Sequence, residues 1–171
     1  MTENKNSKVR IIAQYACLLA FAMMVSYVEA LLPFQPGIPG AKLGLANAAI
    51  VFALYLMGAR GAICINISRV ILCGLLFGNM YSMLYSFAGA IFSLLIMIFL
   101  KKLPGFSMIG VSIAGGVMHN MGQLCIAVFI TSVPVLLYYI PFLMIIGAVT
   151  GLLNGWLAKV LCDRVKKQIE T

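Results

Sequence analysis

The sequence contains very little charge. Charged residues make up 9% of its 171 residues, whereas a soluble domain needs roughly 25% because its surface faces water. Hydrophobic residues make up 63%, and the mean hydropathy is +1.08. A chain of this composition cannot cover its own exterior with polar groups. The composition therefore predicts an integral membrane protein whose exterior is in contact with the lipid bilayer.

Acidic residues are the scarcest charged type, since the chain has only four. The one aspartate, Asp163, lies near the C-terminal end. Paired aspartates for Mg²⁺, an HExxH motif and a GxxxxGK[ST] loop do not occur in the sequence. We therefore expect no enzymatic activity, no catalytic residue, no metal and no cofactor.

The five cysteines also lack the spacing of a metal or redox site. Each stands alone inside an apolar segment, and no CxxC pair occurs. We expect them to act as small apolar packing residues.

Six apolar segments fill the chain, and they span residues 11–32, 43–57, 62–76, 80–100, 107–131 and 133–161. A membrane crossing takes about 20 apolar residues, so the second and third segments are short. A five-span alternative, with residues 43–76 as one broken unit, stays open. We predict an all-α fold with a single transmembrane domain over residues 1–171 and about six transmembrane helices. Residues 1–10 and 162–171 form its cytoplasmic ends.

The basic residues predict the orientation of this bundle. The formal net charge is +8, which we attribute to lysines and arginines in cytoplasmic loops and not to a nucleic-acid partner. With both termini in the cytoplasm, ten of the twelve basic residues face inward. Only Lys42 falls outside, and Arg69 lies within a span. We expect a multi-pass protein of the cell membrane, namely the bacterial plasma membrane.

Proline and glycine mark two further features. Residues 33–42, PFQPGIPGAK, cannot form a helix, and they form either a rigid connector or a lid over a pocket. Gly147, Gly151 and Gly155 follow each other at four-residue spacing. Small residues at this spacing let two helices approach closely, so we predict a packing role for them.

Arg69 falls near the middle of the third segment, and Asn66 lies one turn earlier on the same face. A charge at membrane depth needs a partner or a polar cavity. Glu29 is the one carboxylate expected at depth, because the others lie in the terminal segments. Two interpretations stay open: a structural Glu29–Arg69 pair, or an Arg69 that faces a cavity and binds an anionic ligand.

Two more groups of polar residues complete the predicted site. His119 and Gln123 share a helix face in the fifth segment, beside Asn120. Lys42 and the free N–H groups of the second helix, which we expect to begin at the outer surface, favour an anion, with Asn47 one turn deeper. The predicted substrate-binding residues lie in the outer half or middle of the bilayer, whereas the inner half holds chiefly Asn154. They are Glu29, Lys42, Asn47, Asn66, Arg69, His119, Asn120 and Gln123.

Three motifs carry a resemblance to a known family: PGAKLGLANAAIV at 39–51, GxxGA at 58–62 and GGVMHNMGQL at 115–124. On these motifs the chain resembles the Gx transporter family, whose members are labelled heptaprenyl diphosphate synthase component I. The label implies an accessory membrane subunit at most, because prenyl diphosphate chemistry needs clustered acidic residues. The six-span layout instead resembles the substrate-binding subunits of energy-coupling factor transporters. That resemblance implies a membrane coupling protein and ATPase subunits as partners, with docking at Ala16 and Ala20 of an AxxxA motif.

The function predicted from the sequence is therefore that of a transporter-type substrate-binding subunit. It captures a small solute, anionic or amphipathic, from the outer side of the membrane. The alternatives are an accessory subunit of heptaprenyl diphosphate synthase in isoprenoid or quinone biosynthesis, and a structural or assembly factor.

Overall fold

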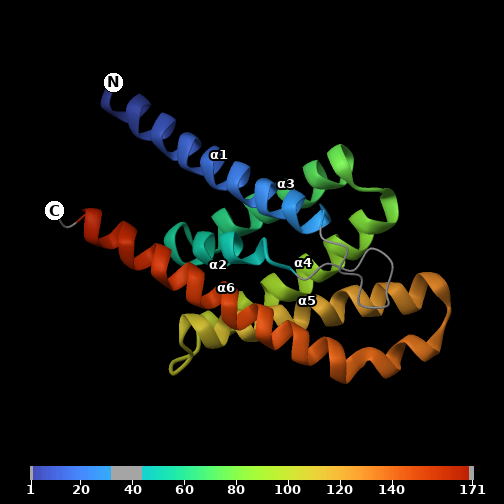
Figure 1. Ribbon diagram of the computed structural model, residues 1–171. Coiled ribbons are helices and arrows are strands. Elements are labelled where there is room, and N and C mark those ends of the chain that lie inside the picture. The colour runs from blue at the N-terminus through green and yellow to red at the C-terminus, as the bar shows by residue number, and fades with distance from the viewer. Residues whose placement is uncertain (1, 32–43, 170–171) are drawn as a thin grey trace.

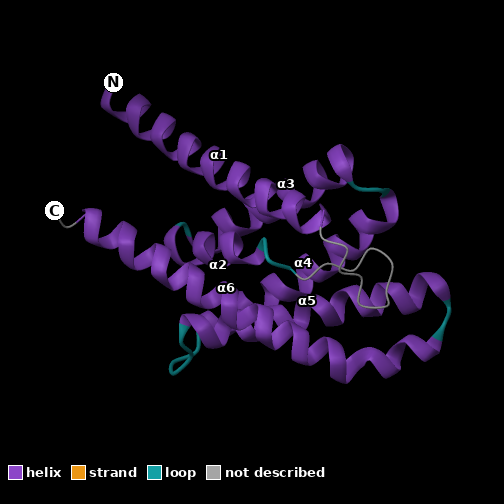
Figure 2. Cartoon of the chain, viewed as in Figure 1, coloured by secondary structure: helices purple, strands orange, loops and turns teal. Residues whose placement is uncertain are grey.

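The structure, a computed structural model, describes residues 2–31 and 44–169, and all regular elements in these ranges are helices (Figures 1 and 2). The predicted lid, residues 33–42, and Lys42 lie outside the described residues. The all-α prediction with six helices is confirmed. In chain order the elements are α1 (Thr2–Leu31), α2 (Asn47–Leu56), α3 (Gly58–Phe77), α4 (Met80–Lys101), α5 (Met108–Thr131), the 3-10 helix η1 (Pro134–Tyr139) and α6 (Ile140–Ile169).

Five helices in the described ranges are long and apolar enough to cross a membrane, and α2 is the shorter sixth. Its ten residues give a length of about 15 Å, half of the hydrocarbon core. α2 and α3 pack against each other, because Leu54 of α2 shares a buried cluster with Ala62 and Ile65 of α3. The second and third apolar segments are thus two separate helices, as the six-helix prediction requires.

The two ends of the described chain lie at the same end of the bundle (Figure 1). The last residue of α4 also lies there, since Lys101 Nζ donates to the carbonyl oxygen of Leu54 at 2.6 Å. The same ammonium lies 4.7 Å from the centre of the Tyr55 ring. Lys166 and Lys167 occupy the last turn of α6. We call this the basic end.

Glycines bring α5 and α6 into backbone contact. A Cβ atom on Gly116 would lie 2.2 Å from the carbonyl oxygen of Gly147, and one on Gly151 would lie 2.6 Å from that of Ser112. No side chain larger than hydrogen fits at these crossings. A Cβ on Gly155 would lie 2.9 Å from the Cα of Ile109. The predicted packing role of the three glycines of α6 is confirmed.

The outside of the bundle carries large apolar side chains that a soluble surface would not expose. Leu75 of α3, Phe129 of α5 and Trp156 of α6 are more than half exposed. An apolar exterior on every long helix suits contact with lipid tails. Several polar side chains, such as those of Arg69, His119 and Asn154, are in contrast buried inside.

Candidate functional site

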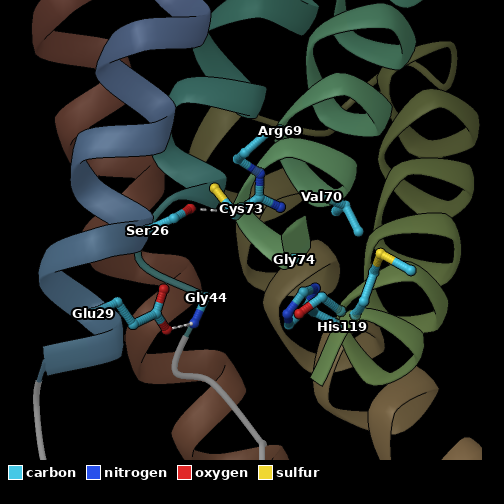
Figure 3. A pocket seen from close by; sticks show the side chains of 10 residues that line it. Ser26, Glu29, Gly44, Arg69, Val70, Cys73, Gly74 and His119 are labelled. Carbon is cyan, nitrogen blue, oxygen red and sulfur yellow. Dashed lines mark hydrogen bonds between the residues drawn. The ribbon is translucent and has the colours of Figure 1, made fainter. Parts of the chain in front are cut away.

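A polar cavity lies between the helices, and Figure 3 shows side chains from α1, α3 and α5 around it. Its volume of about 20 Å³ is enough for roughly one water molecule. Arg69, Glu29 and His119 give it an unusually polar wall for the interior of a membrane bundle. We call it the polar cavity; its lining residues are Ser26, Glu29, Gly44, Arg69, Val70, Cys73, Gly74, Met83, Ser86 and His119.

Arg69 is the charge at the centre of this wall. Its Nη1 donates to Ser26 Oγ at 3.2 Å, and its Nη2 donates to Asn66 Oδ1 at 2.9 Å. Glu29 lines the same cavity, and its Oε1 accepts a hydrogen bond from the Gly44 N–H. Arg69 therefore lines a cavity, as the second interpretation requires. A direct Glu29–Arg69 pair stays a prediction. Its Nε has no hydrogen-bond partner among the described residues.

Ser86 contributes a second buried polar atom to the cavity wall. It lies on α4, and its Oγ has no hydrogen-bond partner among the described residues. A buried polar group without a partner costs about 1–3 kcal/mol. Arg69 Nε and Ser86 Oγ are thus two polar atoms of one cavity that an added group could satisfy.

Gly44 ties the start of α2 into the bundle. Its N–H donates to Glu29 Oε1 of α1, and its carbonyl oxygen accepts from Asn154 Nδ2 of α6 at 2.9 Å. Gly44 is buried, and α2 begins three residues later at Asn47. The expectation that this segment starts at the outer surface of the membrane stays a prediction. The first N–H groups of α2 are not free to bind an anion, contrary to the prediction from the sequence, because those of Asn47, Ala48 and Ala49 donate to the carbonyl oxygens three residues earlier.

His119 lies between two glycines that leave room for its ring. A Cβ on Gly89 of α4 would lie 2.9 Å from His119 Nδ1, and one on Gly44 would lie 3.3 Å from His119 Cδ2. Gln123, one turn later on α5, places its Nε2 3.0 Å from His119 Nε2. The shared helix face predicted for His119 and Gln123 is therefore observed. Gln123 contacts the His119 ring but does not line the cavity itself.

The predicted asparagines occupy different places around the site. Asn66 accepts a hydrogen bond from Arg69, and its Nδ2 donates to the carbonyl oxygen of Ala90 at 3.4 Å. Asn47 is buried at the start of α2 next to Gly44. Asn120 turns toward α6, where its Nδ2 donates to the carbonyl oxygen of Leu143 at 2.8 Å. Of the three, Asn66 and Asn47 lie beside the cavity, and Asn120 links α5 to α6.

Three residues of the site did not stand out in the sequence. Ser26 and Ser86 are single serines in apolar helices, a residue type too common in membrane spans to signal a site. Asn154, expected away from the site, reaches it by bonding to Gly44. The small residues Ala16 and Ala20 of the predicted docking motif lie on the exposed face of α1.

These observations define a polytopic α-helical membrane protein with a small polar cavity enclosed by its helices. Within the described residues no three histidine, cysteine or acidic side chains are grouped so that they could hold a metal ion. A family model described as heptaprenyl diphosphate synthase component I matches residues 18–161. The chain belongs to this family. No curated protein and no solved structure matches the sequence.

Proposed function

We propose that this chain is the solute-binding subunit of a membrane transporter and that the polar cavity receives the polar part of the solute. The proposal depends on two residues that line one cavity, Arg69 and Ser86, each of which has a buried polar atom without a partner among the described residues, namely Arg69 Nε and Ser86 Oγ. Burying an arginine at membrane depth costs at least about 2.5–3.5 kcal/mol. A solute that accepts from Arg69 Nε and bonds to Ser86 Oγ offsets part of this cost.

The charges at the cavity favour a solute whose polar part has no net charge. Arg69 and Glu29 carry opposite charges and both line the cavity. A zwitterionic or neutral polar group complements such a pair, whereas a purely anionic group meets the repulsion of Glu29. This narrows the anionic or amphipathic solute expected from the sequence.

The cavity must widen to admit a solute, because its volume of about 20 Å³ is that of roughly one water molecule. Met83 of α4 is the lining side chain best suited to move, since it is unbranched and has three rotatable bonds. Entry from the end opposite the basic end follows from the predicted orientation, in which the termini are cytoplasmic.

Transport against a gradient needs an energy source, and the sequence contains no GxxxxGK[ST] loop. A membrane coupling protein and ATPase subunits, as in energy-coupling factor transporters, supply it in this proposal. The exposed face of α1 that carries Ala16 and Ala20 is the docking surface, because small residues let a partner helix approach closely.

The test is an untargeted mass-spectrometric search for small molecules that copurify with the protein. We expect a solute with the wild type and the Arg60→Ala control, since Arg60 is exposed at the start of α3. Arg69→Ala removes a charged hydrogen-bond donor worth about 1.5–3 kcal/mol, which corresponds to roughly a 10- to 150-fold loss of affinity. Equal recovery from Arg69→Ala and Arg60→Ala would show that the cavity is not the binding site.

A second candidate is an accessory membrane subunit of a prenyl diphosphate synthase, and the description of the matched family favours it. Deleting the chain then abolishes prenyltransferase activity in membranes and leaves solute uptake unchanged. The transporter proposal predicts the opposite pair of results.

A further inference from the structure

An apolar groove runs along the outside of the α3–α4 hairpin, next to the polar cavity. Its volume is about 160 Å³. Ile63 and Ile67 of α3 and Phe87, Ile91 and Leu95 of α4 form its walls, and all five are partly exposed toward the lipid side. Asn66 and Val70 lie at its floor, where both are buried.

The groove and the polar cavity meet at Val70, which lines both. Figure 3 shows Val70 on the side of the cavity away from Ser26 and Glu29. Asn66 joins the two spaces a second time, because it lines the groove and accepts a hydrogen bond from Arg69 of the cavity wall. The two spaces are therefore neighbours, with Val70 and the Asn66–Arg69 pair between them.

The order of contacts along the hairpin fixes the direction of the groove. Nearest the loop at Gly78, a Cβ on Gly74 would lie 2.8 Å from Met83 Sδ. Farther along, Asn66 Nδ2 contacts the Ala90 carbonyl oxygen at 3.4 Å. The cavity lies at the Gly74–Met83 level, and the groove extends from Val70 back to Ile63. Ile63 and Val70 are seven positions apart on α3, which corresponds to about 10 Å along the helix axis.

We propose that the solute is an amphipathic molecule, whose polar part lies in the polar cavity and whose apolar part leaves past Val70 into the α3–α4 groove. This inference rests on the proposed function and adds the chemical class of the solute. A dry cavity of about 150 Å³ lined by Leu, Ile and Phe binds benzene, so the groove takes an apolar group on the order of six carbon atoms. The apolar part reaches the groove once the Val70 and Met83 side chains have moved.

The test captures whatever occupies the groove. The photoreactive amino acid p-benzoyl-phenylalanine replaces Phe87, which lines the groove, and in a control it replaces Phe92. Phe92 belongs to the same helix, does not line the groove, and is 41% exposed against 38% for Phe87. Irradiation in cells is followed by mass determination of the adducts.

We expect position 87 to capture a small amphipathic molecule and position 92 to capture phospholipid alone. In the Arg69→Ala background the adduct at position 87 falls at least tenfold, and the phospholipid adduct at position 92 stays unchanged. Ser86→Ala, a milder substitution that retains the bundle, lowers the position 87 adduct in the same direction.

Phospholipid alone at both positions, or no adduct at position 87, overturns the inference and identifies the groove as an ordinary lipid contact. A copurified solute that depends on Arg69 but has no apolar part also overturns it, while the proposed function stands. The proposed function itself is refuted by a different result, namely that no copurified molecule depends on Arg69.

Discussion

Replacing Gly44 by alanine tests the central contact of the site. Gly44 has φ +79°, a left-handed conformation that costs an L-residue about 1–2 kcal/mol. Its new Cβ would also lie 3.0 Å from Asn47 Nδ2 and 3.3 Å from His119 Cδ2. Neither neighbour can withdraw easily, because both are buried. Overpacking of this kind adds roughly 1–3 kcal/mol.

Gly58 and Gly105 provide matched controls for this substitution. Their φ values are +80° and +93°, and a Cβ on either would meet no atom within 4 Å. Gly58→Ala and Gly105→Ala therefore lower the free energy of unfolding only through the left-handed backbone conformation, by about 1–2 kcal/mol. Gly44→Ala adds the cost of overpacking to the same backbone cost, so it lowers the free energy of unfolding by roughly 2–5 kcal/mol.

Reversible unfolding with sodium dodecyl sulfate in mixed micelles measures the free energy of unfolding of all three variants. We expect Gly44→Ala to be the least stable, and to lose copurified solute even where it folds. If Gly44→Ala is no less stable than Gly58→Ala, then the His119 ring does not lie against Gly44 and the site as described is wrong.

The remaining predictions concern the packing of the bundle. Gly116→Ala places a Cβ against the backbone of α6 and lowers the free energy of unfolding by about 1–3 kcal/mol. In the control Gly110→Ala, on the same helix, the Cβ meets no atom closer than 3.5 Å, and the free energy of unfolding does not fall. Equal stabilities of the two variants in the micelle assay would contradict the close α5–α6 crossing. Lys101→Met removes the hydrogen bond and the cation–π contact at the end of α2 and loses about 1–2 kcal/mol. The neighbouring Lys102→Met stays within about 0.5 kcal/mol of wild type, and a Lys101 variant as stable as that control would show that the ammonium does not hold α2.

The helices and their local pairs could be predicted because they depend on neighbouring residues. Six apolar segments set the six helices, and the spacing of Gly147, Gly151 and Gly155 indicated the contact that they make with α5. Asn66 and Arg69, three residues apart, are hydrogen-bonded to each other. Residues three positions apart on a helix are neighbours on its surface, so this pair does not depend on the rest of the fold.

The remainder of the site depends on which helix faces meet, and the sequence of a membrane bundle carries little of that information. Lipid tails are as apolar as leucine, so no polar face marks the outside of a helix. Asn120 and His119 are adjacent in sequence, yet one bonds to α6 and the other lines the cavity. Gly44 and Asn154 are joined across 110 residues, a contact that no local pattern predicts.

The most direct measurement is an experimental structure of the protein extracted with its native lipids, solved at a resolution that shows bound small molecules. We predict solute density within hydrogen-bonding distance of Arg69 Nε and Ser86 Oγ that continues past Val70 into the α3–α4 groove. A single water-sized peak at Arg69, with the solute bound elsewhere, would contradict it.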